Sequence, residues 1–525
     1  MSVDGSGVWI SRFDDGELRE RAAGIDPGLP LAGLTFAVKD NIDVAGLPTT
    51  AACPDFAYQP ERSAAVVTRL EKAGAIAVGK TNLDQFATGL TGARSPYGSP
   101  ESVFGGGLIS GGSSSGSAVA VANGSVDFAL GTDTAGSGRV PAALNGIYGI
   151  KPTRGLLSTL GVVPACRSLD CVSIFARDLA TAQRVMRVAR GPERDDPWSR
   201  VEHKKVIDRP RIGVPESIEA DAGQEKAFAR FTGDTTVDIS PLLEAGDLLY
   251  RGPWVAERLA DLGEFVDRHQ SSILPITRQI LEGGHRFTAA DAFRAQHRLQ
   301  ELRAATDRMW ERIDVLALPT IGTTFTHDEI AEDPIGHNLT LGWYTQFANL
   351  LDLAAVTVPN GFTEDGRPAS ITLFGPAFSD DTLMELALTI PTDDVMTLAV
   401  VGLHLRGEPR NNELLDRGGR LLRTTRTASC YRLYQLSSGA PGLVRATGSD
   451  TDEGASIEVE LWQLPASKVG GFLAGIPAPL ALGRLELEDG AQVTGFLCEA
   501  YAVNGAPDIT ASGGWRNHRL KGSHS

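Results

Sequence analysis

Two stretches of small residues decide the fold of this chain: residues 105–117, GGGLISGGSSSGS, and residues 131–141, GTDTAGSGRVP. The first leads into the apolar run 118–124, which is typical of a helix that packs closely in a core. The second continues the apolar strand expected at 128–131 into a turn of short side chains. A strand, a tight turn and a close-packed helix together indicate a layered α/β fold.

The pattern outside these stretches extends the same architecture. A helix is expected at 64–73 between strands at 34–38 and 76–79, and later elements include strands at 211–215, 315–319 and 355–359 and helices at 257–270 and 289–312. The chain looks foreshortened near 231–234 and again near 391–394. Beyond these joins lie β-rich segments at 397–405, 430–436 and 457–461. We therefore predict a large domain, 1–391, and a smaller one, 396–525.

Composition excludes several classes of protein. With 525 residues, of which 42% are hydrophobic and 22% charged, the chain is not disordered throughout. A net charge of −16 argues against a nucleic-acid binder or a binder of anionic membranes. We see no secretory signal and no run of about 18 apolar residues that would span a membrane. Five cysteines are too few for a disulfide scaffold, and they favour a cytoplasmic location.

Metal binding is not expected either. Cys166 and Cys171 lie close in sequence but lack the second Cys pair or the His that zinc sites usually supply. We interpret them as small buried hydrophobic residues.

Three interpretations compete for the Gly/Ser stretch. A flexible linker is disfavoured because apolar elements flank it on both sides. A phosphate-binding loop is disfavoured because no Gly-Lys-Ser/Thr precedes the helix. The third interpretation is a buried relay of hydroxyl groups, in which a nucleophilic Ser needs a base and donors for an oxyanion. The turn 133–137 offers successive backbone N–H groups around Ser137.

These motifs, with the upstream Val-Lys-Asp-Asn at 38–41, resemble the amidase signature family over roughly residues 30–390. The resemblance implies that Ser137 is the nucleophile, that Ser113 is a bridging serine beside a cis peptide and that Lys39 is the base. It also implies a substrate contact at Gly112 and an oxyanion hole formed by the N–H groups of Thr134, Ala135, Gly136 and Ser137. A lysine ordinarily has a pKa near ~10.4, but burial disfavours its charged form. A neutral Lys39 can accept the proton of Ser137 through Ser113.

Further residues resemble the allophanate hydrolase branch of that family, which also occurs within urea amidolyase. They are Ala135, Gly138 and the segments 164–171 and 249–258. The resemblance implies that Tyr250 and Arg258 hold allophanate, H₂N–CO–NH–COO⁻, whose carboxylate suits the fork of a guanidinium. A core aromatic remains the alternative for Tyr250, and a solvated helix face remains the alternative for Arg258.

The second domain resembles the C-terminal domain of the same branch through residues 401–411, VGLHLRGEPRN. The resemblance implies an α+β fold akin to γ-glutamyl cyclotransferase, in which His404 promotes decarboxylation of the first product, N-carboxycarbamate. A structural role for His404 is the alternative. Arg410 stands where that pattern leads us to expect an apolar residue.

The resemblance as a whole implies a mixed sheet flanked by helices, with no metal and no organic cofactor. Its expected partners are a small-molecule substrate, further copies of the chain in a dimer or larger homo-oligomer, and upstream amide-degrading enzymes. Breakdown of urea and breakdown of s-triazines both remain open as the source of allophanate. The rival functions are a glutaminase-type component of an amidotransferase and a non-catalytic scaffold.

Overall fold

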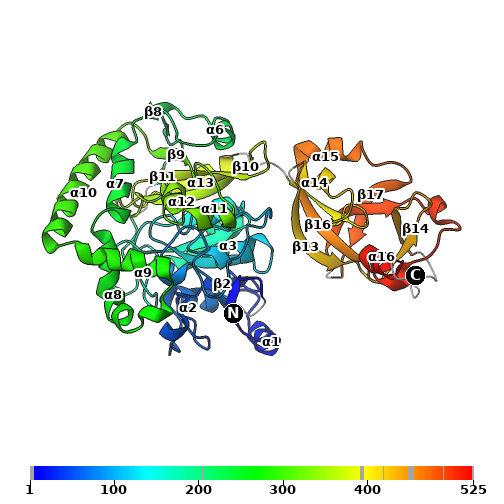
Figure 1. The fold of residues 1–525 in the computed structure, drawn as a ribbon, viewed down its shortest axis with the longest axis horizontal. Coiled ribbons are helices and arrows are strands. Elements are labelled where there is room, and N and C mark those ends of the chain that lie inside the picture. The colour runs from blue at the N-terminus through cyan, green and yellow to red at the C-terminus, as the bar shows by residue number, and fades with distance from the viewer. Residues whose placement is uncertain are drawn as a thin grey trace. The chain divides into compact units, whose positions relative to one another are not determined.

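The computed structural model describes residues 5–203, 206–390, 395–417, 419–446, 454–488 and 490–522 (Figure 1). The chain divides into two compact units, Met1–Thr392 and Asp393–Ser525. Residues 391–394, where the sequence suggested an abrupt join, lie outside the described residues.

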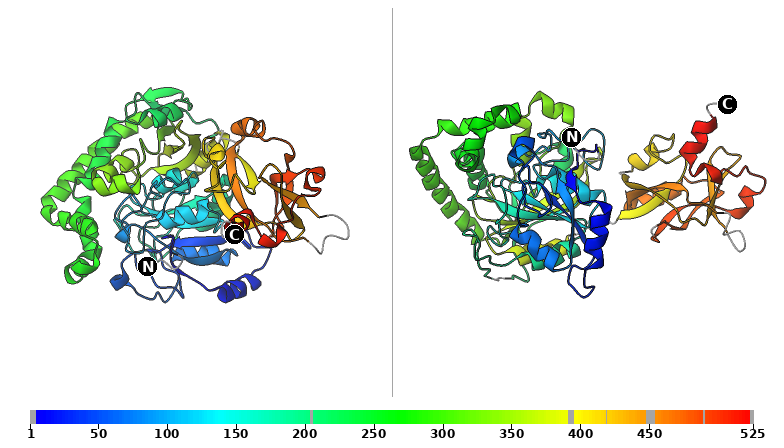
Figure 2. Two further views of the ribbon diagram at one scale, coloured as in Figure 1. Left: turned by 45° about the vertical axis from the view of Figure 1, so that its right-hand side comes forward. Right: turned by 90° about the horizontal axis from the view of Figure 1, so that it is seen from below.

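A single mixed sheet organises the first unit (Figures 1 and 2). Its strand order is β1-β3-β2-β4-β6-β5-β10-β11-β9-β7-β8. The strands are β1 Trp9–Arg12, β2 Thr35–Lys39, β3 Ile76–Thr81, β4 Phe128–Asp133, β5 Tyr148–Lys151, β6 Cys171–Ala176, β7 Ile212–Pro215, β8 Thr235–Val237, β9 Val315–Pro319, β10 Ala354–Phe362 and β11 Pro368–Gly375. β2 runs parallel to β3 and β4, whereas β4 and β6 are antiparallel, so the expected mixed sheet is confirmed.

Helices surround this sheet, as expected (Figure 2). They are α1 Asp15–Ala23, α2 Ala65–Lys72, α3 Ser115–Ala122, α4 Val140–Leu144, α5 Leu179–Ala189, α6 Ala222–Phe228, α7 Ser240–Tyr250, α8 Trp254–Arg268, α9 Pro275–Glu282, α10 Ala289–Trp310, α11 His327–Glu332, α12 Gly336–Gly342 and α13 Asp380–Thr389. Near 231–234, where the sequence looked foreshortened, α6 ends and the chain turns directly into β8. The Asp234 N–H donates to the carbonyl of Ile212 at 2.7 Å and holds the start of β8 beside β7.

The Gly/Ser stretch explains how α3 reaches the centre of the unit. Every residue of α3 is buried, and serine hydroxyls at its start bind the neighbouring strand. Ser117 Oγ donates to the Leu130 carbonyl at 2.9 Å, and Ser114 Oγ donates to the Thr132 carbonyl at 3.1 Å. A Cβ at Gly116 would lie 2.3 Å from the Val8 carbonyl oxygen, so only glycine allows this approach.

The second unit contains a five-stranded sheet of order β13-β16-β12-β18-β17 and the hairpin β14–β15. Its elements are β12 Val395–Val400, α14 Asn412–Leu415, β13 Arg420–Arg426, β14 Tyr431–Gln435, β15 Pro441–Arg445, β16 Glu458–Pro465, α15 Ala466–Leu473, β17 Leu480–Glu486, β18 Gln492–Cys498 and α16 Trp515–Gly522. The strand expected over 397–405 ends earlier, at Val400. Gly402 has a φ of +94°, and a Cβ there would lie 2.0 Å from Pro441 Cγ, so the extended chain cannot continue.

Candidate active site

Lys39 and Ser113 meet at the carboxyl ends of two parallel strands. β2 pairs in parallel with β4 through Val38 and Leu130, so Lys39 and Thr132 come to the same edge of the sheet. Lys39 Nζ donates to Ser113 Oγ at 2.7 Å and to Thr132 Oγ1 at 2.8 Å. The Gly112–Ser113 peptide bond is cis. The structure thus brings together the predicted base and the predicted bridging serine.

Burial controls the charge of Lys39. The side chain is fully buried, and desolvation lowers its pKa from the usual value near 10.5 to about 7. The negative charges of Asp84, Asp170 and Asp133 oppose this fall. A substantial fraction of Lys39 is therefore neutral near pH 7 and able to accept a proton.

Gly112 lies against a buried carboxylate. A Cβ at this position would lie 2.1 Å from Asp84 Oδ2, so the backbone comes close to Asp84 only because residue 112 is glycine. Its N–H donates to the Leu90 carbonyl at 2.8 Å. Gly112 therefore offers no free N–H to a substrate, although its carbonyl remains a candidate contact.

Ser137 lies in the turn between β4 and α4 and is 4% exposed. Its hydroxyl has no hydrogen-bond partner among the residues that the structure describes, so the expected link from Ser113 to Ser137 is not formed in this conformation. The hydroxyl is consequently free to approach a substrate carbonyl.

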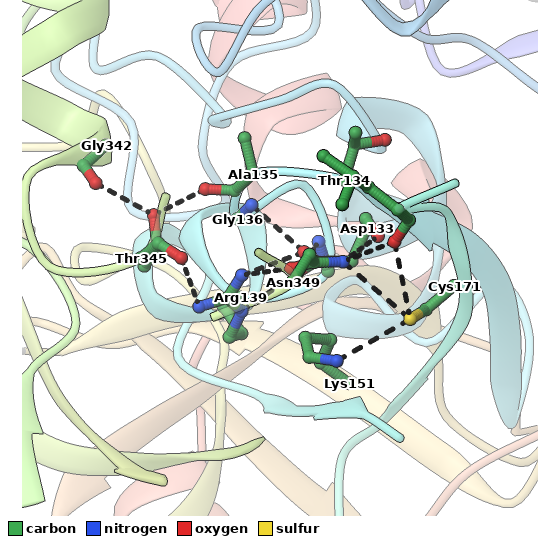
Figure 3. A network of polar contacts seen from close by, with 12 residues as sticks. Asp133, Thr134, Ala135, Gly136, Arg139, Lys151, Cys171, Gly342, Thr345 and Asn349 are labelled. Atoms are coloured by element: carbon green, nitrogen blue, oxygen red, sulfur yellow. Dashed lines mark hydrogen bonds and ion pairs between the residues drawn. The ribbon is translucent and has the colours of Figure 1, made fainter. Parts of the chain in front are cut away.

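A buried ion pair fixes the turn that carries Ser137 (Figure 3). Arg139 donates to both oxygens of the Asp133 carboxylate, at 2.8 and 2.9 Å, and both side chains are fully buried. Burial alone would raise the pKa of Asp133, but the Arg139 guanidinium outweighs that effect and the pKa lies below its usual value. The same carboxylate accepts the N–H groups of Gly136 and Gly138, at 3.0 and 2.9 Å. Asp133 therefore shapes the backbone on both sides of Ser137.

This geometry corrects the expected oxyanion hole. The N–H of Gly136 is already bonded to Asp133 and cannot serve an oxyanion in this conformation. The N–H groups of Thr134, Ala135 and Ser137 have no acceptor within the described part of the chain and remain available. The expected set of four donors is therefore reduced to three.

Two residues that sequence reasoning missed complete the network in Figure 3. Thr345 Oγ1 donates to the Ala135 carbonyl at 2.8 Å, so the Ala135–Gly136 peptide is held at both of its ends. Asn349 Nδ2 donates to the Asp133 carbonyl at 2.7 Å and to the Leu169 carbonyl at 2.9 Å. Both residues lie more than two hundred positions from the turn, and no local pattern could have paired them with it.

Tyr250 ends α7, and Arg258 lies on the buried face of α8, with 5% of its surface exposed. An Arg258 Nη donates to Thr88 Oγ1 at 2.6 Å. In the described part of the chain no carboxylate lies within ion-pair distance of this guanidinium. The pKa of the Tyr250 phenol is raised by burial, while the charge of Arg258 acts in the opposite direction. The solvated-face interpretation of Arg258 is therefore wrong.

His404 lines a separate cavity of about 200 Å³ in the second unit. The ring stacks on Phe496 at 5.1 Å, and its Nε2 lies 3.3 Å from Glu413 Oε2. Burial lowers the pKa of His404, and the bond to Glu413 opposes that shift. Arg410, unexpected from the sequence, also lines the cavity and binds both oxygens of Glu413, at 2.7 and 2.9 Å.

The described ranges hold neither a metal-binding cluster nor a membrane-spanning helix. Within them, no three His, Cys, Asp or Glu side chains gather as they would around a metal ion. Cys166 and Cys171 are buried free thiols. None of the helices in those ranges is both long and apolar enough to cross a bilayer.

Comparison with known proteins identifies the family to which the chain belongs. The family described as Amidase matches residues 14–384, and the Allophanate hydrolase C-terminal domain matches residues 396–520. The urea amidolyase of Saccharomyces cerevisiae is 43% identical over 93% of this chain, which spans 29% of that protein's length. The urea amidolyase of Lachancea kluyveri is 39% identical over 97% of this chain and 31% of its own length. The solved allophanate hydrolase of Kluyveromyces lactis is 38% identical with a TM-score of 0.71, over 99% of this chain and 94% of that one.

The chain belongs to the amidase family. Its match to the allophanate hydrolase C-terminal domain and its likeness to the Kluyveromyces lactis allophanate hydrolase confirm the narrower resemblance seen in the sequence.

The burial of Lys39 predicts a pH-dependent stability. Between the folded pKa of about 7 and the usual value near 10.5, the unfolded chain binds a proton that the folded chain does not. Protonation of Lys39 in the unfolded chain favours unfolding, and this effect on the free energy of unfolding weakens as the pH rises. Relative to Lys39→Met, the parent should gain stability from about pH 7 to 10, by up to about 1.4 kcal/mol per pH unit.

Thermal unfolding of both proteins across this pH range measures the effect. Lys226→Met, at an exposed lysine, is the control and should show no such slope against the parent. A difference between parent and Lys39→Met that does not change with pH would mean that Lys39 is charged in the folded protein.

Proposed function

We propose that this chain is an allophanate hydrolase. Residues 1–391 would form the amidase domain, which converts allophanate and water to ammonia and N-carboxycarbamate. Residues 396–525 would promote the decarboxylation that follows. Membership of the amidase family supports amide hydrolysis, and the substrate is the more specific part of the proposal.

The observation that carries the substrate assignment is the unpaired guanidinium of Arg258. A buried cation without a carboxylate partner is costly, and it is retained where a ligand supplies the opposite charge. The Thr134 hydroxyl donates to Asp170 at 2.5 Å, and the charge of Arg258 acts on that same carboxylate. Asp170 therefore links the guanidinium to the turn that carries Ser137. Allophanate has its carboxylate beside the scissile amide and matches this arrangement.

The proposed chemistry uses three side chains, and it requires the hydrogen bond between Ser137 and Ser113 to form when the substrate binds. Neutral Lys39 accepts the proton of Ser113, which in turn accepts that of Ser137 as its oxygen attacks the terminal carbamoyl carbon. The N–H groups of Thr134, Ala135 and Ser137 stabilise the oxyanion. The relay returns a proton to the leaving ammonia, and water then attacks the acyl enzyme by the reverse path. N-carboxycarbamate and free Ser137 result.

The second step is assigned to the His404 cavity. Decarboxylation of N-carboxycarbamate requires a proton at nitrogen, and His404 is a titratable group that can deliver one. Arg410 lines the same cavity and is paired with Glu413, so a carboxylate of the product would have to compete with Glu413 for its guanidinium.

The setting of the reaction is also proposed. We infer a cytoplasmic enzyme, since all five cysteines are free thiols. We retain a dimer or larger homo-oligomer, and association with upstream amide-degrading enzymes, as expectations from the family resemblance. Light scattering of the purified chain tests the first, and co-purification from the native host tests the second.

Ser137→Ala should abolish ammonia release from allophanate, by ~10³-fold or more, because nucleophilic attack is lost. Ser173→Ala is a matched control: Ser173 is buried beside Gly138, and its hydroxyl has no hydrogen-bond partner in the described structure. The control should keep activity within a few-fold of the parent. Turnover by Ser137→Ala within ten-fold of the parent would exclude Ser137 as the nucleophile.

Arg258→Gln should separate charged from neutral substrates. The kcat/KM for allophanate should fall ~10²-fold, as expected for the loss of a charge-assisted pair in a buried site. Biuret, which has no carboxylate, should be hydrolysed slowly and at similar rates by both proteins. Arg268→Gln, an exposed change on the same helix, is the control. Equal losses on both substrates would assign Arg258 to the fold.

His404→Phe should delay carbon dioxide release without slowing the first ammonia. Phenylalanine keeps the stacking on Phe496 but cannot transfer a proton. The measurement is the interval between the first ammonia and the carbon dioxide that follows, with His518→Phe as the control in the same unit. If His404→Phe and the parent show the same interval, His404 has no part in decarboxylation.

A further inference from the structure

A second cavity, of about 270 Å³, lies beside Tyr250. It is formed by the end of α7 and parts of α8, α9 and α12, and its polar lining residues are Arg94, Tyr250, Arg251, Gln279, Arg286 and Asn338. Three of its lining residues are arginines, and none is Asp or Glu. In a chain with a net charge of −16, such a concentration of positive charge favours an anionic ligand.

Arg94 is the buried cation of this cavity, with 4% of its surface exposed. One of its Nη atoms donates to the Thr88 carbonyl at 3.0 Å and the other to the Pro334 carbonyl at 2.5 Å. Its Nε is buried without a hydrogen-bond partner, and none of the described carboxylates lies within ion-pair distance. Asp84 is the carboxylate whose charge acts on it most strongly, through space. Arg94 therefore retains an unused donor and has no ion-pair partner in the described part of the chain.

The other two arginines add to this charge. Arg286 is exposed and lies over the Phe287 ring at 4.7 Å, and it has no ion-pair partner in the described part of the chain. Arg251 makes only a long contact of 3.8 Å with Asp247. The cavity therefore has a buried cation inside and a free cation on its exposed side.

Thr88 connects this cavity to the proposed substrate site. Its carbonyl accepts from Arg94, and its hydroxyl accepts from Arg258. The charges of both guanidinium groups act on the Tyr250 phenol, which lines the cavity. Arg94, which lines the cavity, and Arg258, which is proposed to hold the substrate carboxylate, are thus joined through one residue, Thr88.

We propose that this cavity is an entry site that captures small carboxylate anions and passes them to Arg258. This inference rests on the proposed function and extends it: Arg286 and Arg94 concentrate carboxylate-bearing amides at the site, whereas neutral amides gain nothing. Arg286 is accordingly a specificity residue that acts on substrate capture and leaves the chemical step unchanged.

Arg286→Gln tests the proposal, because the side chain is exposed and its replacement should leave the fold intact. The kcat/KM for allophanate should fall on the order of three- to ten-fold through KM, with kcat unchanged and a weaker dependence on added salt. Biuret hydrolysis should not change, and Arg286→Lys should restore capture. Arg278→Gln is the matched control, since Arg278 lies on α9, contacts Glu282 and does not line the cavity. An unchanged kcat/KM for allophanate, a loss in kcat, or equal losses on both substrates would overturn the proposal.

A binding measurement separates this inference from the proposed function. Acetate and acetamide are titrated into Ser137→Ala and into Ser137→Ala with Arg286→Gln, and calorimetry records the binding. Acetate should bind the first protein more tightly than the second, and acetamide should bind neither. Equal acetate binding to both proteins would contradict the entry site, whatever the parent does with allophanate. A parent inert towards allophanate would instead contradict the proposed function.

Discussion

The first unit depends on one constraint: the amino group of Lys39 is kept out of water at the end of β2. Hydroxyl groups of Ser113 and Thr132 replace its hydration, and buried carboxylates at Asp84, Asp133 and Asp170 limit how far its pKa falls. Placing a serine against this nitrogen requires a helix of small residues packed tightly on β4. The small residues of the Gly/Ser stretch therefore allow the close packing that brings Ser113 to the buried Lys39.

A second buried charge sets the geometry opposite the base. In the Asp133–Arg139 pair, the Asp133 carboxylate accepts hydrogen bonds from the N–H groups of Gly136 and Gly138. The Thr345 hydroxyl donates to the Ala135 carbonyl. A Cβ at Gly136 would lie 2.2 Å from Thr345 Oγ1, so the turn tolerates only glycine there. Breaking such a buried pair costs ~3–5 kcal/mol, which makes the turn rigid and fixes where Ser137 and its neighbouring N–H groups point.

The sequence predicted those features that depend on residues close together along the chain. The strands around the Gly/Ser stretch could be predicted, because each leaves a continuous apolar pattern. The roles of Lys39, Ser113 and Ser137, the mixed sheet and the smaller α+β unit were expected only from the family resemblance. Thr345, Asn349 and Arg94 could not be predicted, because their roles arise only when distant segments meet. That the Gly136 N–H is bonded to Asp133 could not be predicted, since residue type does not reveal which peptide faces a carboxylate. The strand expected beyond Val400 ends early, although the apolar pattern continues past Gly402.

The neutral state of Lys39 is the central claim, and the pH dependence of kcat/KM tests it most directly. The substrate should be biuret, a neutral compound that carries no carboxylate for the cationic groups to recognise, followed between about pH 5.5 and 9. Because the base acts only when deprotonated, the account predicts a rate that rises with pH, reaches half its maximum near the Lys39 pKa of about 7 and then levels off. A rate that keeps rising towards pH 9 would show that Lys39 titrates as an ordinary lysine, and it would contradict the account.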